Sequence, residues 1–262
     1  MSLLCSIDGQ ITPVEEATVS VTDEGLVRGD GAFELLKLYD GRAFALKDHL
    51  DRLGVTCNGV FLDWDRALFE REIDALLEQN ERPDAYLRLI LTRPGRRIAL
   101  LEAPMSFEHD MALSSVRYRP TIVLTGLKTL SYSANMTATR IAQQAGAKEA
   151  LLVEPDGTIL EAPTSSIFWV TADGTIRTPE LESGILASIT RDRVLQVVPV
   201  EEGRYKLEDV FEAAEVFLAS TIREIQGVKE LDGLSYESPG PVTQRVAGLL
   251  SERIQAELNG AA

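Results

Sequence analysis

The residue best suited to covalent chemistry is Lys128, which lies in the segment PTIVLTGLKTLSYSANMTAT. It is the only charged residue among these twenty, although charged residues make up 26% of the chain. Such surroundings are expected to exclude water from the amine and to favour its neutral form, which attacks carbonyl groups to form a Schiff base. A lysine at a strand end can instead extend its ammonium group to solvent, and the pattern alone leaves both interpretations open.

Glu161 is a second charge in unusual surroundings, because small and apolar residues flank it in GTILEAPTSSIFWV. A carboxylate that is buried at such a place needs a partner, whereas a glutamate at an exposed strand end does not. Together, Lys128 and Glu161 supply what an enzyme that uses pyridoxal phosphate requires. The lysine would form the Schiff base, and the acid would pair with the pyridinium nitrogen so that the ring can accept electrons from a carbanion.

The phosphate of such a cofactor needs an anion site, and three segments could contribute to one. GILASITRDRVLQVV places Ile189 and Thr190 at a helix start, where free backbone N–H groups favour anions. EVFLASTIREI places the hydroxyl groups of Ser220 and Thr221 at a strand end. Arg52 in KDHLDRL could add a bidentate cation. Hydroxyl residues at caps and arginines on helix surfaces are also common without any ligand, so each signal alone is weak.

The composition excludes several other classes of function. There are 26 Lys and Arg against 41 Asp and Glu, and the net charge of -15 predicts no nucleic acid or membrane partner. Cys5 and Cys57 are the only cysteines, and His49 and His109 are the only histidines, so we expect no metal site. The scarce cysteines, and the lack of a basic and apolar leader or a long apolar run, predict a soluble, cytoplasmic protein.

Turn signals and periodicity predict a mixed α and β class. Asp-Gly, the strongest short hairpin signal, begins at positions 8, 30, 40, 156, 173 and 232, and FELLKLYDGRAFAL, ALLVEPDGTILEA and SSIFWVTADGTIRTP each predict two antiparallel strands. Apolar stripes over 64–77 and 242–258 predict helices. A polar stretch at about 112–122 predicts a linker, followed by an apolar strand over 121–127. We therefore predict a small N-terminal domain over 1–117 and a larger cofactor-binding domain over 118–262.

Four ordered blocks resemble the class IV aminotransferases, which are pyridoxal phosphate enzymes of fold type IV. They are RGDGAFELLKLYDGRAFALKDHLDRL, LKTLSYSANMTATRIAQQAGAKEALLVEPDGTILEAPTSSIFWV, TPELESGILASITRDRV and EVFLASTIREIQGV. The resemblance covers nearly the whole chain and implies an α/β (mixed α+β) fold of two domains, similar to that of D-amino acid aminotransferase. It also implies pyridoxal 5'-phosphate as cofactor, small amino and 2-oxo acids as ligands, and a homodimer.

The resemblance implies a role for each residue that matches the family's motifs. Lys128 would be the catalytic Schiff-base lysine that also moves the proton of the substrate Cα, and Glu161 would hold the pyridinium nitrogen. Leu186 would pack against the ring, and Tyr132 would lie near its phenolic oxygen, although the branched-chain members place a tyrosine one residue later, at Ser133 here. The phosphate would be bound by Arg52, Ile189, Thr190, Ser220 and Thr221.

Two patterns give different indications of the substrate. AFELLKLYDG resembles the D-amino acid aminotransferases, with Phe33 in place of their tyrosine, and favours D-amino acids. Those enzymes trap the substrate carboxylate with an Arg-x-His pair, whereas TRPGRRIAL contains Arg96 and Arg97 and no histidine. YLR, which ends at Arg88, is similar to the branched-chain members. Phe33, Arg88, Arg96 and Arg97 are therefore the candidate substrate-binding residues, and His49 is expected to be structural.

The leading hypothesis is a homodimeric transaminase that moves an amino group from an amino acid, with D-amino acids favoured, to 2-oxoglutarate or pyruvate. Three alternatives remain open at this point. The first is a branched-chain L-amino acid aminotransferase or (R)-amine transaminase. The second is an aminodeoxychorismate lyase, which would release pyruvate without an amino acceptor. The third is a non-enzymatic domain that carries the cofactor or binds a protein.

Overall fold

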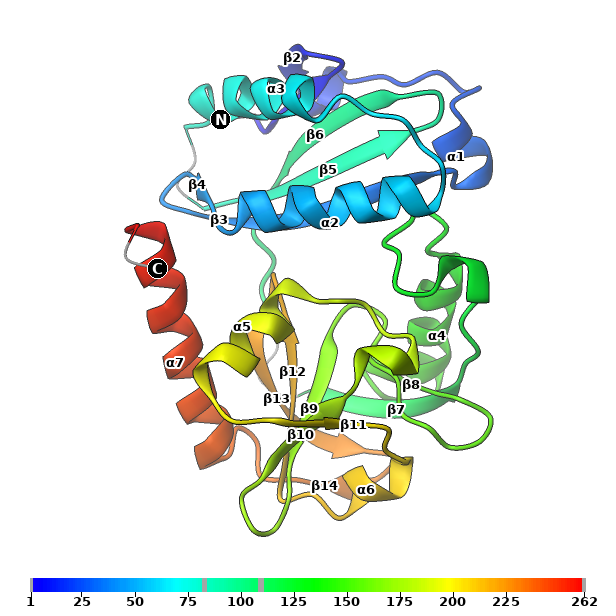
Figure 1. Ribbon diagram of the computed structural model, residues 1–262, viewed down its shortest axis with the longest axis vertical. Coiled ribbons are helices and arrows are strands. Elements are labelled where there is room, and N and C mark those ends of the chain that lie inside the picture. Colours follow the sequence, from blue (N-terminus) through cyan, green and yellow to red (C-terminus); the bar gives the residue numbers. More distant parts are fainter. Residues whose placement is uncertain (1, 82–83, 108–110, 261–262) are drawn as a thin grey trace. The chain divides into compact units, whose positions relative to one another are not determined.

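A computed structural model describes residues 2–81, 84–107 and 111–260 of the chain (Figure 1). His109 lies outside the described residues. The chain forms two compact units, which we call unit 1 and unit 2. Unit 1 comprises Met1–Ser106 and Leu127–Tyr132, and unit 2 comprises Phe107–Gly126 and Ser133–Ala262.

Unit 1 contains an antiparallel sheet with the strand order β2-β1-β6-β5-β3-β4. The Asp-Gly turns predicted at residues 8 and 40 are confirmed: both of their residues have positive φ, as a two-residue hairpin turn of this type requires. The strands are β1 (Leu4–Ile7), β2 (Gln10–Pro13), β3 (Gly31–Tyr39), β4 (Arg42–Ala43), β5 (Tyr86–Thr92) and β6 (Arg96–Glu102).

The helical segments of unit 1 include α3, whose apolar stripe was predicted from the sequence and is confirmed. Asp65 caps its start by accepting a hydrogen bond from the backbone N–H of Leu68 (2.9 Å), and Phe69, Ile73 and Leu76 are fully buried. Both α2 and α3 pack against strands of the sheet (Figure 1). The segments are η1 (Val14–Glu16), α1 (Glu24–Arg28), α2 (Leu46–Gly59) and α3 (Arg66–Glu78).

Alternation along the strands gives the sheet of unit 1 two different faces. The core face packs with α2 and α3 in one hydrophobic cluster and includes Ala32, Leu36, Leu38, Leu87, Leu89, Leu91, Ala99 and Leu101. The second face carries the residues between them, which the strand registers place beside one another: Phe33, Leu35, Lys37, Tyr86, Arg88, Ile90, Ile98, Leu100 and Glu102. Candidate residues are present on both faces.

Unit 2 contains a mixed sheet with the order β11-β10-β9-β12-β13-β7-β8, and β14 pairs with β13. The neighbours β7–β8, β7–β13 and β10–β11 are parallel, and the other pairs are antiparallel. The strands are β7 (Met111–Arg117), β8 (Glu149–Val153), β9 (Ser166–Val170), β10 (Ile176–Pro179), β11 (Glu201–Gly203), β12 (Glu215–Ser220), β13 (Glu224–Leu231) and β14 (Leu234–Ser235).

The long helix predicted over 242–258 is confirmed as α7, whose Val246, Leu250 and Ile254 are buried. The carboxylate of Glu215 caps its start, because it accepts hydrogen bonds from the backbone N–H groups of Val242 (2.9 Å) and Thr243 (2.8 Å). The helical segments of unit 2 are η2 (Ile122–Leu124), α4 (Ser133–Gln144), η3 (Leu181–Ser183), α5 (Ile189–Val197), α6 (Leu207–Phe211) and α7 (Pro241–Leu258).

Two local predictions are wrong. The apolar segment 121–127 is not a strand but contains the short 3-10 helix η2, and Ile122 and Val123 are 90% and 76% exposed. Asp30-Gly31 is not a hairpin turn, because Gly31 begins β3 and the left-handed residue there is Gly29, which ends α1. No helix within the described residues is long and apolar enough to cross a membrane.

The division of the chain into the two units also differs from the domain boundary predicted after residue 117. The predicted linker overlaps β7, which pairs with β8 and β13 and therefore belongs to the sheet of unit 2. Residues 127–132 return to unit 1, where Thr129 forms a β-bridge with Ala32 at the start of β3. This short returning segment carries Lys128.

Candidate active site

Backbone contacts with β3 and α2 fix the position of Lys128 within unit 1. The backbone N–H of Phe33 donates to the carbonyl of Lys128 (3.0 Å), and the N–H of Leu130 donates to the carbonyl of Gly31 (2.9 Å). The N–H of Lys128 itself donates to Oγ1 of Thr56 on α2 (3.1 Å). The main chain of Lys128 is therefore held against β3 and α2.

Two aromatic rings surround the amine of Lys128. Its Nζ lies 4.3 Å from the ring centroid of Phe33 and 5.6 Å from that of Tyr132. The two rings meet edge to face, with centroids 5.3 Å apart. The side chain is half-buried, and these rings, rather than the exposed residues of η2, provide its apolar surroundings. The structure thus brings Lys128, Phe33 and Tyr132 together.

Arg52 lies on the core face of unit 1 in a buried cluster with Glu34 and His49. Its Nε and Nη2 donate to the two carboxylate oxygens of Glu34, both at 2.7 Å, and His49 Nδ1 lies 2.8 Å from Glu34 Oε2. The side chains of Glu34 and His49 are fully buried, and that of Arg52 is 12% exposed. The partners of Glu34 fix the guanidinium group in one orientation.

The charges of this cluster follow from its burial. Burial raises the pKa of Glu34, but the charge and hydrogen bonds of Arg52 and the hydrogen bond of His49 outweigh it and lower the pKa to about 2. Burial lowers the pKa of His49 more than the neighbouring carboxylate raises it. The cluster therefore contains an ionised carboxylate between a guanidinium ion and an imidazole that resists protonation.

Glu161 and Leu186 are brought together in unit 2. The backbone N–H of Leu186 donates to Glu161 Oε1 (2.9 Å), and the carbonyl of Glu161 accepts from the N–H of Leu152 on β8 (2.9 Å). The glutamate is half-buried at the bend before β9. Burial, and then the negative charge of Glu161, raise the pKa of Tyr118. Glu161 thus has a half-buried carboxylate, and hydrogen bonds hold both its main chain and its side chain in place.

The predicted helix start at residue 189 is confirmed. Ser188 caps α5, and its Oγ accepts a hydrogen bond from the N–H of Arg191 (3.2 Å). Ile189 and Thr190 are the first two residues of the helix and are buried. Backbone N–H groups of a first helical turn have no partner within the helix, so this position can bind an anion.

The predicted strand end at Ser220 is also confirmed. Ser220 is the buried last residue of β12, and Thr221 follows it in a turn. The Oγ of Ser220 accepts a weak hydrogen bond from the N–H of Arg223 (3.4 Å), which leaves its own proton available to a ligand. Side chains of α5 and β12 belong to the same hydrophobic cluster in unit 2, which includes Val194 and Phe217.

Arg88 lies on the second face of unit 1 and contacts both Glu102 and Phe33. Its Nε donates to Glu102 Oε1, and its Nη2 donates to Glu102 Oε2 (3.0 Å). Its guanidinium carbon lies 5.9 Å from the ring centroid of Phe33. The structure therefore places Arg88 against the same ring as the amine of Lys128.

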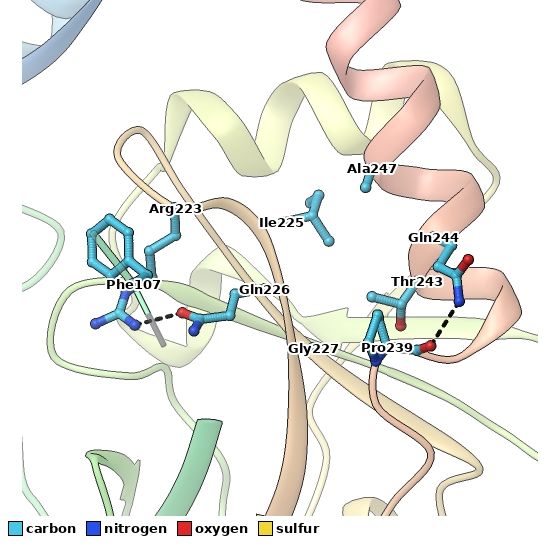
Figure 2. A pocket seen from close by; sticks show the side chains of 9 residues that line it. All are labelled: Phe107, Arg223, Ile225, Gln226, Gly227, Pro239, Thr243, Gln244 and Ala247. Carbon is cyan, nitrogen blue, oxygen red and sulfur yellow. Dashed lines mark hydrogen bonds between the residues drawn. The ribbon is translucent and has the colours of Figure 1, made fainter. Parts of the chain in front are cut away.

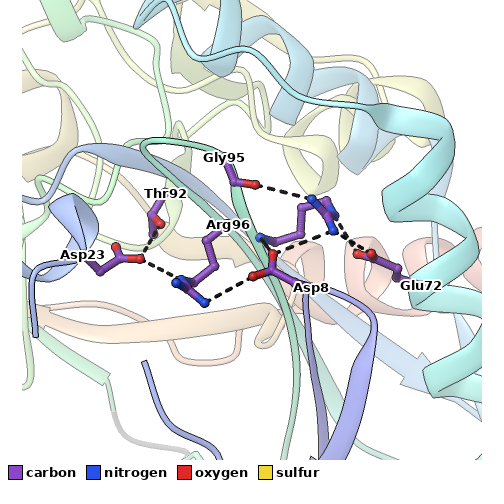
Figure 3. A network of polar contacts seen from close by, with 7 residues as sticks. Asp8, Asp23, Glu72, Thr92, Gly95 and Arg96 are labelled. Atoms are coloured by element: carbon purple, nitrogen blue, oxygen red, sulfur yellow. Dashed lines mark hydrogen bonds and ion pairs between the residues drawn. The ribbon is translucent and has the colours of Figure 1, made fainter. Parts of the chain in front are cut away.

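Arg96 and Arg97 belong to a chain of alternating charges in unit 1 (Figure 3). Arg96 pairs with Asp23 (2.9 Å) and Asp8 (3.2 Å), and Arg97 donates two hydrogen bonds of 2.8 Å to Glu72. Asp8 Oδ1 also accepts from the backbone N–H of Arg97 (2.9 Å). These pairs connect the β1–β2 and β5–β6 turns with α1 and α3, so both arginines have a structural role.

A pocket of about 380 Å³ lies within unit 2, beside β13 and the start of α7 (Figure 2). Arg223 is its charged residue, and its guanidinium group contacts Gln226 (2.6 Å), Glu149 (3.4 Å) and the ring of Phe107 (4.9 Å). The other lining residues are Ile225, Gly227, Pro239, Thr243, Gln244 and Ala247. These residues do not include the predicted site residues.

The predicted site residues are thus divided between the two units. Unit 1 holds Lys128, Tyr132, Arg52, Phe33, Arg88, Arg96 and Arg97. Unit 2 holds Glu161, Leu186, Ile189, Thr190, Ser220 and Thr221. Sequence reasoning missed Thr56 and Glu102, which contact Lys128 and Arg88. A serine, threonine or glutamate on an ordinary helix or strand gives no local signal of such a contact.

Solved structures with the same fold include two transaminases. A fold IV transaminase from Curtobacterium pusillum, CpuTA1, is 26% identical, with a TM-score of 0.86 over 95% of this chain and 99% of that chain. The T.th. branched-chain amino acid aminotransferase, in complex with N-(5'-phosphopyridoxyl)-L-glutamate, shares the fold with a TM-score of 0.89 and 24% identity over 100% of this chain and 96% of that one. The architecture is therefore that of the fold-type IV pyridoxal phosphate enzymes.

Sequence comparison defines the family. Residues 31–231 match the model of amino-transferase class IV, and the chain belongs to this family. A putative branched-chain-amino-acid aminotransferase of Methanocaldococcus jannaschii is 33% identical over 92% of each chain. A D-alanine aminotransferase of Bacillus licheniformis is 28% identical over 95% of this chain and 96% of its own. The resemblance inferred from the four sequence blocks is confirmed, and the chain is an aminotransferase that uses pyridoxal phosphate.

Proposed function

We propose that this aminotransferase transfers an amino group from an amino acid, with D-amino acids preferred, to 2-oxoglutarate or pyruvate. The observation that carries the proposal is the amine of Lys128, whose main chain is fixed to β3 and α2 and whose Nζ lies against Phe33 and Tyr132. The similarity to D-alanine aminotransferases, together with the segment AFELLKLYDG, supports D-amino acids as donors.

The residues present fit pyridoxal 5'-phosphate, because its three recognition requirements have matching chemistry. Glu161 offers a carboxylate for the pyridinium nitrogen, and Leu186 would pack against the ring. The helix start at Ile189 and Thr190, the hydroxyl groups of Ser220 and Thr221, and the guanidinium group of Arg52 suit the phosphate. When bound, the cofactor supplies an electron sink for the carbanion formed at the substrate Cα.

The reaction then depends on protons that this chain's own residues hold or move. Lys128 Nζ is the base that takes the proton from the substrate Cα, which requires the amine to be neutral at that step. The negative charge of Glu161 would keep a proton on the ring nitrogen. The Glu34–His49 contacts would hold Arg52 in the orientation that binds phosphate, and Tyr132 would hydrogen-bond the phenolic oxygen.

A second donor class is supported by a specific observation. The relative from M. jannaschii, at 33% identity, is named as a putative branched-chain enzyme, and Tyr86 and Arg88 match the branched-chain pattern. Branched-chain L-amino acids are therefore the second candidate. The roles of Arg96 and Arg97 as a substrate trap have little support, since both arginines pair with carboxylates.

The active form is proposed to be a cytoplasmic homodimer. Exposed apolar residues near the start of unit 1 support an interface there, since Val21, Leu26 and Val27 are 79%, 64% and 55% exposed. Sedimentation of the holoenzyme tests the dimer, and a monomer at micromolar concentration contradicts it.

The proposed cytoplasmic location is supported by the cysteines. Free, buried Cys5 and Cys57 are consistent with a reducing compartment.

The function is tested by half-reactions followed by absorbance. The holoenzyme is mixed with D- and L-alanine, D- and L-glutamate, D- and L-leucine, a primary (R)-amine and aminodeoxychorismate, without an acceptor. Conversion of the cofactor to its aminated form fastest with a D-amino acid supports the proposal, and L-leucine as the fastest donor supports the second candidate. Release of pyruvate from aminodeoxychorismate, or no conversion by any donor, contradicts both.

A further inference from the structure

The second face of unit 1 holds an arginine within an apolar row. In the sheet register Arg88 lies opposite Leu35 on β3 and opposite Leu100 on β6. Glu102, two residues after Leu100 on the same strand, therefore projects from the same face. Its carboxylate accepts hydrogen bonds from both Nε and Nη2 of Arg88, and the two side chains are 28% and 24% exposed.

This pairing decides the net charge at Arg88. A guanidinium ion between two leucines needs a compensating anion, and Glu102 supplies it with bidentate geometry. The carboxylate occupies the Nε and Nη2 edge of Arg88, and its charge cancels that of the arginine. A second carboxylate that approaches Arg88 must compete with Glu102 for hydrogen bonds and meets its negative charge.

The pair lies beside the reacting group. Arg88 Cζ and Lys128 Nζ lie 5.9 Å and 4.3 Å from the centroid of the same Phe33 ring. A base must come within hydrogen-bond distance, about 3 Å, of the proton that it removes. Substituents of a substrate Cα next to Lys128 therefore lie close to Phe33 and its neighbours on the second face.

We propose that Glu102 is a specificity-determining residue, which neutralises Arg88 and so selects amino and 2-oxo acids with uncharged side chains over those with a second carboxylate. The inference rests on the proposed role of Lys128 at the substrate Cα. Of the two acceptors proposed above, pyruvate is therefore preferred to 2-oxoglutarate, and alanine-like and branched-chain amino acids are preferred to glutamate. Glu102 acts through Arg88 and does not itself take part in the proton transfer.

The test replaces the carboxylate by an amide of the same size in Glu102→Gln. Steady-state kinetics compare 2-oxoglutarate with 2-oxopentanoate, which has a methyl group where the former has its second carboxylate. We expect KM for 2-oxoglutarate to fall roughly fivefold to tenfold, because Arg88 becomes free to form a charge-assisted pair with the ligand. KM for 2-oxopentanoate should stay within about twofold.

Binding without turnover gives a second measurement. Glutarate and pentanoate differ in the same way and do not react, and their dissociation constants are measured from the change that they cause in the absorbance of the holoenzyme. Glutarate should bind more tightly to Glu102→Gln than to the wild type, and pentanoate should not. The double variant Arg88→Gln/Glu102→Gln, which is also neutral at this position, should lose the gain.

Two further variants serve as controls. Glu70→Gln removes an ion-paired carboxylate from α3, on the other side of the sheet, and should leave the substrate preference unchanged. Glu102→Asp keeps the negative charge and should retain the wild-type substrate preference. A change seen in Glu102→Gln alone is then due to the lost charge and not to a folding defect caused by substitution at this position.

Three results overturn the inference. The first is an equal decrease in KM for both acceptors in Glu102→Gln, which would assign Arg88 to the carboxylate that they share. The second is an unchanged KM for 2-oxoglutarate, and the third is tighter binding of glutarate that persists in the double variant. If the wild type converts no amino acid, the proposed function itself fails. An active wild type with an unchanged Glu102→Gln variant refutes this inference alone.

Discussion

The two faces of the sheet in unit 1 each carry a bidentate Arg–Glu pair, but in different surroundings. On the core face, Arg52 and Glu34 are 12% and 0% exposed, and His49 is a third partner. On the second face, Arg88 and Glu102 are 28% and 24% exposed. Removing one partner of a buried pair strongly destabilises the folded protein, whereas a partly exposed pair contributes little to its stability. The same pair of side chains is therefore expected to stabilise the protein strongly on the core face and weakly on the second face.

The largest effect is expected at the lysine beside the second face. Lys128→Ala removes the proposed base and should lower the turnover number by about 10⁴-fold or more, with loss of the yellow absorbance of the holoenzyme. Lys37→Ala is a matched control, since Lys37 Nζ lies 4.7 Å from the ring centroid of Tyr39 on the same strand, β3. Turnover near the wild-type level in Lys128→Ala would sink the assignment.

The next effect concerns the core face. Glu34→Gln leaves Arg52 and His49 without their buried carboxylate, and we expect the free energy of unfolding of unit 1 to fall by about 3–5 kcal/mol. Trp64 lies in unit 1 and Trp169 in unit 2, so urea unfolding in a Trp169→Phe background reports on unit 1 alone. A loss below about 1 kcal/mol, typical of a surface pair, would contradict the difference between the faces.

Acid should weaken the core face through the same cluster. The pKa of Glu34 is lowered to about 2 from its ordinary value of 4.5, so the stability that this group contributes is complete above about pH 4.5 and is lost as the pH falls towards 2. The pKa of His49 is lowered below 6.5, so the unfolded chain binds its proton first and stability also falls as the pH drops below 6.5.

Unfolding of unit 1 by urea at a series of pH values checks this prediction. His49→Gln should remove the part of the loss that begins near pH 6.5, and Glu34→Gln the part between pH 4.5 and 2. A wild-type stability that is constant from pH 7 to 3 would show that neither group is coupled to folding as the cluster requires.

Local signals in the sequence were sufficient for the elements that hold much of the site. Asp-Gly turns predict the hairpins of β1–β2 and β3–β4, and the segment GILASITRDRVLQVV predicts the helix start at Ile189, because turn geometry and capping depend on neighbouring residues. The strand predicted over 121–127 failed for the opposite reason, since periodicity does not reveal whether an apolar residue is exposed.

Partners distant in the sequence could not be predicted in this way. Arg96 and Arg97 looked like candidates for a substrate trap, but their carboxylates come from Asp8, Asp23 and Glu72, which only the folded sheet brings together. Arg88 meets Glu102 because the β5–β6 register places Tyr86 opposite Glu102, and a shift of one residue would move Glu102 to the other face.

The smallest effect measures the contrast between the two faces directly. A double-mutant cycle with Arg88→Gln and Glu102→Gln should give a coupling free energy of at most about 1 kcal/mol, and added salt should reduce it, because solvent screens a partly exposed pair. Urea unfolding of the four proteins, followed by Trp64, supplies the measurement. A coupling above about 2 kcal/mol would mean that the pair is held as firmly as a buried one. The second face would then differ from the core face in position but not in strength.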